Sequence, residues 1–261
     1  MKILVCVKQV PDTAEIKIDP EKNTLIRAGV PSIVNPFDAY ALEIAVRLKE
    51  QNGGTVTVLS MGPEQAKEAI VECLSVGADE GYLVSDRKFG GSDTLATSYI
   101  LSNAIKKLGE FDVILCGKQA IDGDTGQVGP EIAEHLGYPQ VTYALDAKIS
   151  EGRLQVKREQ ESGYKIVEVQ TPVVLSVSKT AFEQRFATIK SKLAARRKVI
   201  PMITSEDINL DFTRVGLKGS PTKVKKTFTP KRSKTCIRIE EPDEKLAANK
   251  LLEALSEAKI M

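Results

Sequence analysis

The chain has 261 residues, of which 42% are hydrophobic and 28% charged, a composition typical of a globular protein with one large domain or one domain and an appendage. No apolar run approaches the roughly 18 residues of a membrane span, and the short run behind Met1 ends at Lys8, too early for a signal peptide. Four widely spaced cysteines and a single histidine argue against a disulfide framework or a histidine-based metal site, and they favour free thiols in a cytoplasmic protein.

The net charge of +2 conceals an uneven distribution. Residues 185–234 hold 14 Lys or Arg against three Asp or Glu, so this segment carries +11 and the rest of the chain −9. Basic segments are common in nucleic-acid binding proteins, but here no stacking pattern of aromatic residues and no known module accompanies the charge. We therefore predict no nucleic-acid partner.

Strand and helix patterns alternate over the first two-thirds of the chain. Short continuous apolar runs predict buried strands, and apolar residues spaced three and four apart predict helices. Asn35 and Pro36 suit the N-cap and the first position of the first helix. This alternation predicts an α/β fold with a doubly wound parallel sheet covered on both faces. In chain order the expected elements are strand 3–7, helix 36–52, strand 55–61, helix 63–76, strand 81–84, helix 93–108, strand 113–116 and helix 131–136.

The pattern changes after residue 150. A polar hairpin is expected at about 152–170 and one more buried strand at 172–177. Residues 205–240 show little periodicity, which is typical of an extended arm, and a helix at about 243–258 has four leucines on one side. We therefore expect an α/β domain over residues 1–200 and a C-terminal arm with a helix over 201–261, docked on another surface such as a partner chain.

The richest motif is the loop Gly117–Pro130, GKQAIDGDTGQVGP, between a predicted strand and a predicted helix. Its glycines allow the backbone to approach a ligand, and the free amides at the next helix's N-terminus favour an anion. It matches neither the GxGxxG dinucleotide fingerprint nor the GxxxxGK[ST] P-loop. The pattern predicts a nucleotide site, with a plain chain-reversing turn as the alternative.

Several segments together resemble the β-subunit of electron-transfer flavoproteins, in order and at matching spacing over about residues 1–200. They are VCVKQV at 5–10, NPFD at 35–38, SMGP at 60–63, VGAD at 76–79 and, above all, the loop 117–130. The resemblance implies the adenine-nucleotide-hydrolase-like sheet and an obligate α-subunit that carries its own FAD. The positions that it assigns to a nucleotide are Cys6, Lys8, Asn35, Phe37, Asp38, Met61, Gly117, Lys118, Gln119, Ala120, Ile121, Asp122, Gly123, Asp124, Thr125, Gly126, Gln127 and Val128.

The family divides on which nucleotide this site holds. One branch holds AMP as a structural ligand, and the flavin-bifurcating branch holds a second FAD that takes two electrons from NADH and passes one each to a high- and a low-potential acceptor. Gly123 and Gly126 leave room for a diphosphate, and the stretch 86–94 also resembles the bifurcating branch. We therefore expect FAD here, NADH as donor and ferredoxin or flavodoxin as low-potential acceptor, with AMP as the alternative. The residues assigned to the second end of the cofactor are Phe89, Gly90, Gly91, Ser92, Asp93 and Thr94.

Simpler roles stand beside these assignments. Asp93 and Asp124 suit an N-cap and a turn, and Phe89 suits core packing. No side chain is assigned a catalytic role, because the cofactor supplies the redox chemistry. A free-standing nucleotide-hydrolysing enzyme is the weakest alternative, because the first strand–helix loop, QVPDT at 9–13, lacks a Ser-Gly-Gly phosphate loop.

The segment 182–198 corresponds in the family to a docking site for a dehydrogenase. Its Ala187-Thr188-Ile189 followed by basic residues is family-like. The remaining detail leaves two flavin-dependent partners open, an acyl-CoA dehydrogenase and a lactate-type 2-hydroxy-acid dehydrogenase.

Overall fold

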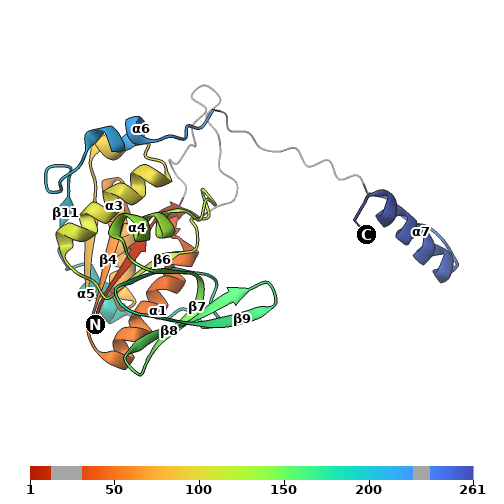
Figure 1. The fold of residues 1–261 in the computed structure, drawn as a ribbon, viewed down its shortest axis with the longest axis horizontal. Helices are drawn as coiled ribbons and strands as arrows, with labels where there is room; N and C mark the ends of the chain where they lie inside the picture. Colours follow the sequence, from red (N-terminus) through yellow and green to blue (C-terminus); the bar gives the residue numbers. More distant parts are fainter. Residues whose placement is uncertain (13–30, 226–235, 261) are drawn as a thin grey trace. The chain divides into compact units, whose positions relative to one another are not determined.

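The computed structural model describes residues 1–12, 31–225 and 236–260 (Figure 1). Packing divides the chain into two units, Met1–Lys225 and Lys226–Met261.

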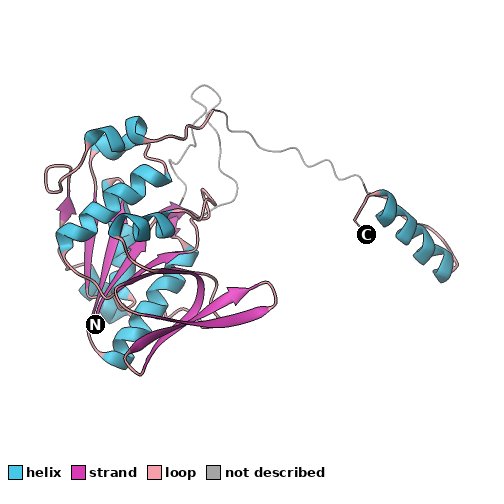
Figure 2. Cartoon of the chain, in the orientation of Figure 1, coloured by secondary structure: helices cyan, strands magenta, loops and turns pink. Residues whose placement is uncertain are grey.

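A nine-stranded sheet forms the centre of the first unit (Figure 2). Its order is β11-β5-β4-β1-β6-β10-β7-β8-β9; the strands from β11 to β7 run parallel, and β8 and β9 add an antiparallel hairpin. A small antiparallel pair, β2 and β3, lies outside this sheet. The strands are β1 Lys2–Val7, β2 Gln9–Pro11, β3 Ser32–Val34, β4 Thr55–Met61, β5 Glu80–Val84, β6 Val113–Gly117, β7 Gln140–Ser150, β8 Arg153–Gln160, β9 Gly163–Val169, β10 Val173–Val177 and β11 Met202–Ile203.

Helices cover both faces of the parallel part of the sheet. Alternate residues of β1 enter two separate apolar clusters: Ile3, Val5 and Val7 pack with α1 and α2, and Leu4 and Cys6 pack with α3 and α4. This arrangement confirms the predicted doubly wound α/β fold. The helices are α1 Pro36–Asn52, α2 Lys67–Ser75, α3 Thr94–Leu108, α4 Val128–Leu136, α5 Ile189–Ala195 and α6 Gly216–Gly219, with short 3-10 turns η1 Glu64–Ala66, η2 Arg87–Phe89 and η3 Phe212–Arg214.

The direction of winding reverses at β1. From β1 the chain passes through α1 to β4 and through α2 to β5, and then α3 carries it back to β6 on the other side of β1. In open parallel sheets, ligands bind outside the carboxyl ends of the two strands that flank such a reversal. Here those ends are Val7 of β1 and Gly117 of β6.

The hairpin expected at about 152–170 is present as β8 and β9, but it is continued by an unpredicted strand. β7 is 11 residues long and joins the parallel part of the sheet, beside β10, to the hairpin. Its buried residues, Val141, Ala144 and Ala147, are separated from one another by half-buried and exposed ones. The sequence of β7 therefore contains no continuous apolar run that would predict a strand here.

The arm was expected to begin at residue 201, and residues 202–220 lie against the sheet and α3. β11 extends the sheet beside β5, and Ile208, Leu210 and Val215 are buried with the α3 side of the core. These apolar residues show no period because they come from an irregular segment that contacts the domain at separate points. The part of the expected arm at 226–235 lies outside the described residues.

The second unit contains α7, Glu244–Glu257, close to the helix expected at 243–258. Asp243 caps it by accepting hydrogen bonds from the amides of Lys245 and Leu246. Within the unit, Leu246, Leu251 and Leu252 are about half exposed. Among the described helices, none is both long and apolar enough to cross a lipid bilayer.

Candidate functional site

One buried carboxyl group joins the two strand ends at the reversal point. Asp38, in the first turn of α1, accepts a hydrogen bond from the Lys8 amide (2.7 Å) on one oxygen and from the Gly117 amide (3.0 Å) on the other. Burial raises the pKa of Asp38 to about 7, although these hydrogen bonds act to lower it. The ends of β1 and β6 are therefore held in register by a side chain from the helix that follows β1.

The loop 117–128 is fastened to the same helix through Asn35. The Asn35 side chain, 1% exposed, donates to Gln119 O (2.9 Å) and accepts from the Ile121 amide (3.2 Å). Asn35 is the N-cap residue of α1, as predicted. Its side chain makes no capping hydrogen bond, because its amide nitrogen and its amide oxygen are both hydrogen-bonded to the loop. The Lys8 ammonium adds an ion pair with Asp122 (2.7 Å).

The tip of the loop is exposed and has space above its glycines. A Cβ atom built on Gly123 would meet nothing within 4 Å, and one on Gly126 would meet only Lys118 O, at 3.4 Å. Gly126 has φ +64°, a conformation that favours glycine, and Asp124 has φ +53° and accepts from the Gln119 side chain (2.7 Å). At these two glycines the loop therefore exposes backbone atoms, with no side chain above them, at the carboxyl edge of the sheet.

The helix after the loop begins earlier than predicted, at Val128 and not at residue 131. Its first intrahelical hydrogen bond runs from the Glu131 amide to Gln127 O (3.0 Å), so the amides of Val128 and Gly129 precede the ladder. Gly129 packs closely on the strands, since its Cβ would lie 3.4 Å from that of Cys116. Pro130 suits the first turn because it has no amide to leave unpaired.

The second loop, residues 86–94, meets the first through Thr94, whose hydroxyl donates to the Gln127 side-chain oxygen (2.9 Å). Asp93 caps α3 through the Ala96 amide (3.1 Å) and also accepts from the amide and hydroxyl of Thr222 (3.0 and 2.8 Å). The Gly216 amide donates to the Ser92 hydroxyl (3.1 Å). Loop 86–94 is therefore the anchor for residues 202–222, a role without a local sequence signal because the partners lie more than 120 residues apart.

Several assigned residues lie away from the loop tip. Phe89 is 4% exposed and packs in the core beneath α3, the simpler of its two expected roles. The Lys118 ammonium faces the rings of Phe37 (5.9 Å) and Tyr143 (5.2 Å). Met61, half-buried, ends β4 beside this edge.

Cys6 and Cys116 are register partners on β1 and β6, and both are buried. Their mutual hydrogen bond, and then burial, raise the pKa of Cys116 well above the usual range. Cys73 is buried too, and burial likewise raises its pKa. The three thiols thus act as small core residues, as their apolar surroundings in the sequence indicated.

The groups gathered at this edge are backbone amides, side-chain amides and carboxylates already engaged in hydrogen bonds, an arrangement suited to binding and orientation. The sheet topology and the loop 117–128 define a doubly wound α/β protein with a glycine-rich loop at its reversal point. The model of the electron transfer flavoprotein domain matches residues 22–208. The chain belongs to the electron transfer flavoprotein family.

Three relatives show how far the similarity extends. The chain is 52% identical to the electron transfer flavoprotein subunit beta of Megasphaera elsdenii over all of both chains. It is 51% identical to the caffeyl-CoA reductase-Etf complex subunit CarD of Acetobacterium woodii, over 88% of each chain. It is 44% identical to the acryloyl-CoA reductase electron transfer subunit gamma of Anaerotignum propionicum, over 93% of this chain and 94% of the relative.

Proposed function

We propose that this chain is the β-subunit of a heterodimeric electron transfer flavoprotein of the bifurcating kind, and that its own site holds FAD. The α-subunit is the obligate partner, NADH the donor, and ferredoxin or flavodoxin the low-potential acceptor. The observation that carries the proposal is the loop 117–128 at the strand reversal, with open space above Gly123 and Gly126.

The chain's own residues fit a diphosphate-containing ligand. Asp38 and Asn35 hold the loop backbone from below, so its exposed amides keep a fixed geometry. The amides that open α4 favour a phosphate oxygen. When bound, FAD would supply the exchange of electron pairs for single electrons; the protein would orient it and limit its contact with water.

AMP is the second candidate for the same site. A single phosphate needs only loop 117–128, whereas FAD also needs room for its second half near loop 86–94. The Thr94–Gln127 hydrogen bond, which brings the two loops together, supports the longer ligand. With AMP bound, all redox chemistry would belong to the α-subunit.

An acyl-CoA-type flavin dehydrogenase is the proposed high-potential partner. Two relatives carry names of CoA-thioester reductase systems, which favours this class over a lactate-type dehydrogenase. Its docking site would be the segment 182–198, where Phe186 is 95% and Ile189 81% exposed among basic residues.

Counting cofactors tests the proposal. The purified αβ pair should release two FAD per heterodimer, and Gly126→Val should lower this to one, since a branched side chain at φ +64° blocks close approach. Asp124 is exposed, so Asp124→Ala should weaken binding less, by one or two hydrogen bonds, which are worth about 1–3 kcal/mol if the ligand buries them. One FAD and one AMP per wild-type pair would refute the bifurcating assignment, and full occupancy in Gly126→Val would refute the site.

A further inference from the structure

We infer that Arg185 is a positioning residue for partner docking: it clamps the start of the segment 182–198 to α1 and thereby fixes where Phe186 and Ile189 are presented. The inference rests on the proposed docking function of this segment. It assigns to Arg185 a role inside the subunit, with no contact to the partner.

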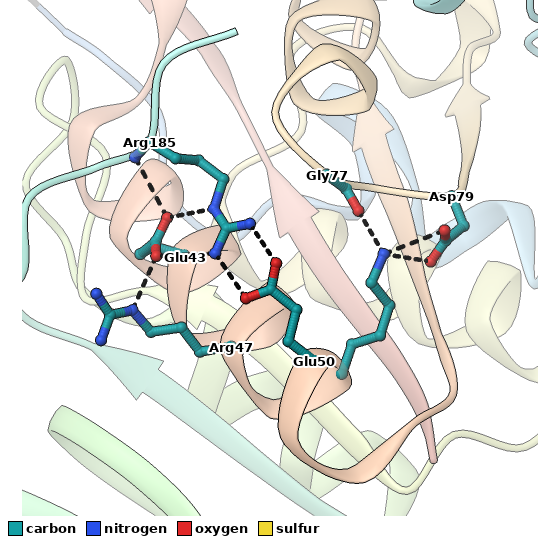
Figure 3. Close-up of polar contacts among 7 residues, drawn as sticks. Glu43, Arg47, Glu50, Gly77, Asp79 and Arg185 are labelled. Carbon is teal, nitrogen blue, oxygen red and sulfur yellow. Dashed lines mark hydrogen bonds and ion pairs between the residues drawn. The ribbon is translucent and has the colours of Figure 1, made fainter. Parts of the chain in front are cut away.

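The clamp consists of the Arg185 guanidinium and two glutamates of one helix (Figure 3). The Arg185 guanidinium donates to both oxygens of Glu43 (3.0 and 3.2 Å) and to both oxygens of Glu50 (2.7 and 3.1 Å), and its backbone amide also donates to Glu43 (3.3 Å). Glu43 and Glu50 lie two turns apart on α1, so the planar guanidinium of an arginine can bind both of them, whereas the ammonium of a lysine cannot. Arg185 is therefore held with its charge directed back onto its own domain.

A second cation completes the attachment. Arg47 donates to Glu43 (2.8 Å), and its guanidinium lies 4.0 Å from the centre of the Phe182 ring. Burial alone would raise the pKa of Glu43, but its hydrogen bonds with Arg185 and Arg47 hold it below the usual value. Glu43 is 5% exposed as a side chain, so the clamp is anchored on a carboxylate that solvent barely reaches.

The segment is fixed at its far end as well. Thr188 caps α5, and Ala195, 2% exposed, belongs to the buried core on the side of α2. Between the two attachments, Phe186, Ile189 and Leu193 are 95%, 81% and 53% exposed. Lys190 and Lys192 flank these apolar side chains, so the surface suits an apolar pocket with an acidic rim.

If Arg185 positions the segment, its loss should lower the affinity for the dehydrogenase and leave the other properties of the subunit unchanged. An exposed phenylalanine on a free segment would have to be ordered at the moment of docking, which weakens binding. In Arg185→Gln, the KM for the dehydrogenase should rise about tenfold, which corresponds to about 1.4 kcal/mol. NADH oxidation with a small dye as acceptor, and the flavin content of the αβ pair, should stay unchanged.

The test uses the αβ pair with a purified short-chain acyl-CoA dehydrogenase, and a flavin-dependent lactate dehydrogenase as second probe. Glu50→Gln is the discriminating variant, because Glu50 lies on α1 and is 55% exposed as a side chain. If Arg185 positions the segment, Glu50→Gln should raise the KM severalfold and speed amide hydrogen exchange at 186–192. If Arg185 touches the partner directly, Glu50→Gln frees the guanidinium and the KM stays or falls, which would overturn the inference.

Three further variants complete the design. Arg185→Lys keeps the charge but cannot span both glutamates, so its KM should be intermediate; a wild-type value would overturn the inference. Lys106→Gln, on α3 at the opposite face of the sheet, removes one exposed cation and should leave the KM unchanged. Phe186→Ala tests the docking proposal itself. If Phe186→Ala raises the KM and Arg185→Gln does not, only the clamp is overturned. If neither variant raises the KM, the docking function is overturned.

Discussion

At the scale of single residues, the fold and the candidate site depend on the same atoms around Gly117. A Cβ atom there would lie 2.3 Å from the Asp38 carboxylate and 2.8 Å from the Asp38 amide. We expect Gly117→Ala to lower the free energy of unfolding by about 3 kcal/mol, through the clash and the strained Asp38 hydrogen bond. Urea denaturation would measure this loss.

Gly123→Ala is the matched control in the same loop. Its Cβ would meet nothing within 4 Å, and its φ is not in the left-handed region. Its stability should stay within about 0.5 kcal/mol of wild type. Equal stability of the two alanine variants would show that Gly117 is replaceable and that the junction is looser than described.

Asp38 should make stability depend on pH in a direction opposite to that of most carboxyl groups. Burial raises its pKa to about 7, whereas an unfolded aspartate titrates near 4 (about 3.9). Between these two values the folded state therefore keeps a proton that the unfolded state loses. The contribution of Asp38 to the free energy of unfolding is complete below about pH 4 and is lost as the pH rises to about 7. The slope is about 1.4 kcal/mol per pH unit.

Urea denaturation of wild type and Asp38→Asn between pH 5 and 8 checks this behaviour. The difference between the two unfolding free energies isolates Asp38 from other groups, such as His135, whose pKa burial lowers. We expect the wild type to lose stability relative to the variant as the pH rises to about 7. A difference that is constant over this range would contradict the raised pKa.

At the scale of elements, Asn35 couples α1 to the loop 117–128. Asn35→Ala removes its hydrogen bonds with Gln119 O and the Ile121 amide but no capping bond of α1. We expect amide hydrogen exchange at 119–127 to accelerate by a factor that corresponds to about 1–3 kcal/mol, while α1 exchanges as in wild type. Unchanged protection of the loop would show that Asp38 and Lys8 hold it alone.

Elements that depend on local pattern were predictable, and those that depend on distant partners were not. Strands β1 and β6 show continuous apolar runs because both their faces are covered, and the glycine-rich loop stands out by composition. β7 and β11 are strands because of their neighbours, not because of their own sequence. Likewise, Asp93 was recognisable as an N-cap, but its hydrogen bonds with Thr222 cross 129 residues and leave no local signal.

At the scale of the whole chain, the boundary at Lys225 determines which truncations are informative. Residues 202–220 contribute buried side chains and β11 to the first unit, so a chain that ends near residue 200 should expose part of the core around α3. A chain that ends after Glu240 removes α7 and spares those contacts. Its thermal unfolding should match that of the full-length chain.

The same truncation should weaken the αβ pair. Leu246, Leu251 and Leu252 are about half exposed within their own unit, so burial on an α-subunit would gain for each leucine about half of the roughly 1.5–3 kcal/mol that a fully exposed leucine gains. We therefore propose that α7 docks on the α-subunit and expect the truncated pair to dissociate in gel filtration at micromolar concentration, where the full-length pair stays intact. A variant with Leu246, Leu251 and Leu252 all changed to Ser, at full length, should dissociate in the same way, because it removes the apolar face but keeps the chain. If both altered pairs survive dilution as well as the wild type, α7 does not hold the subunits together, and its leucines must be covered by another surface.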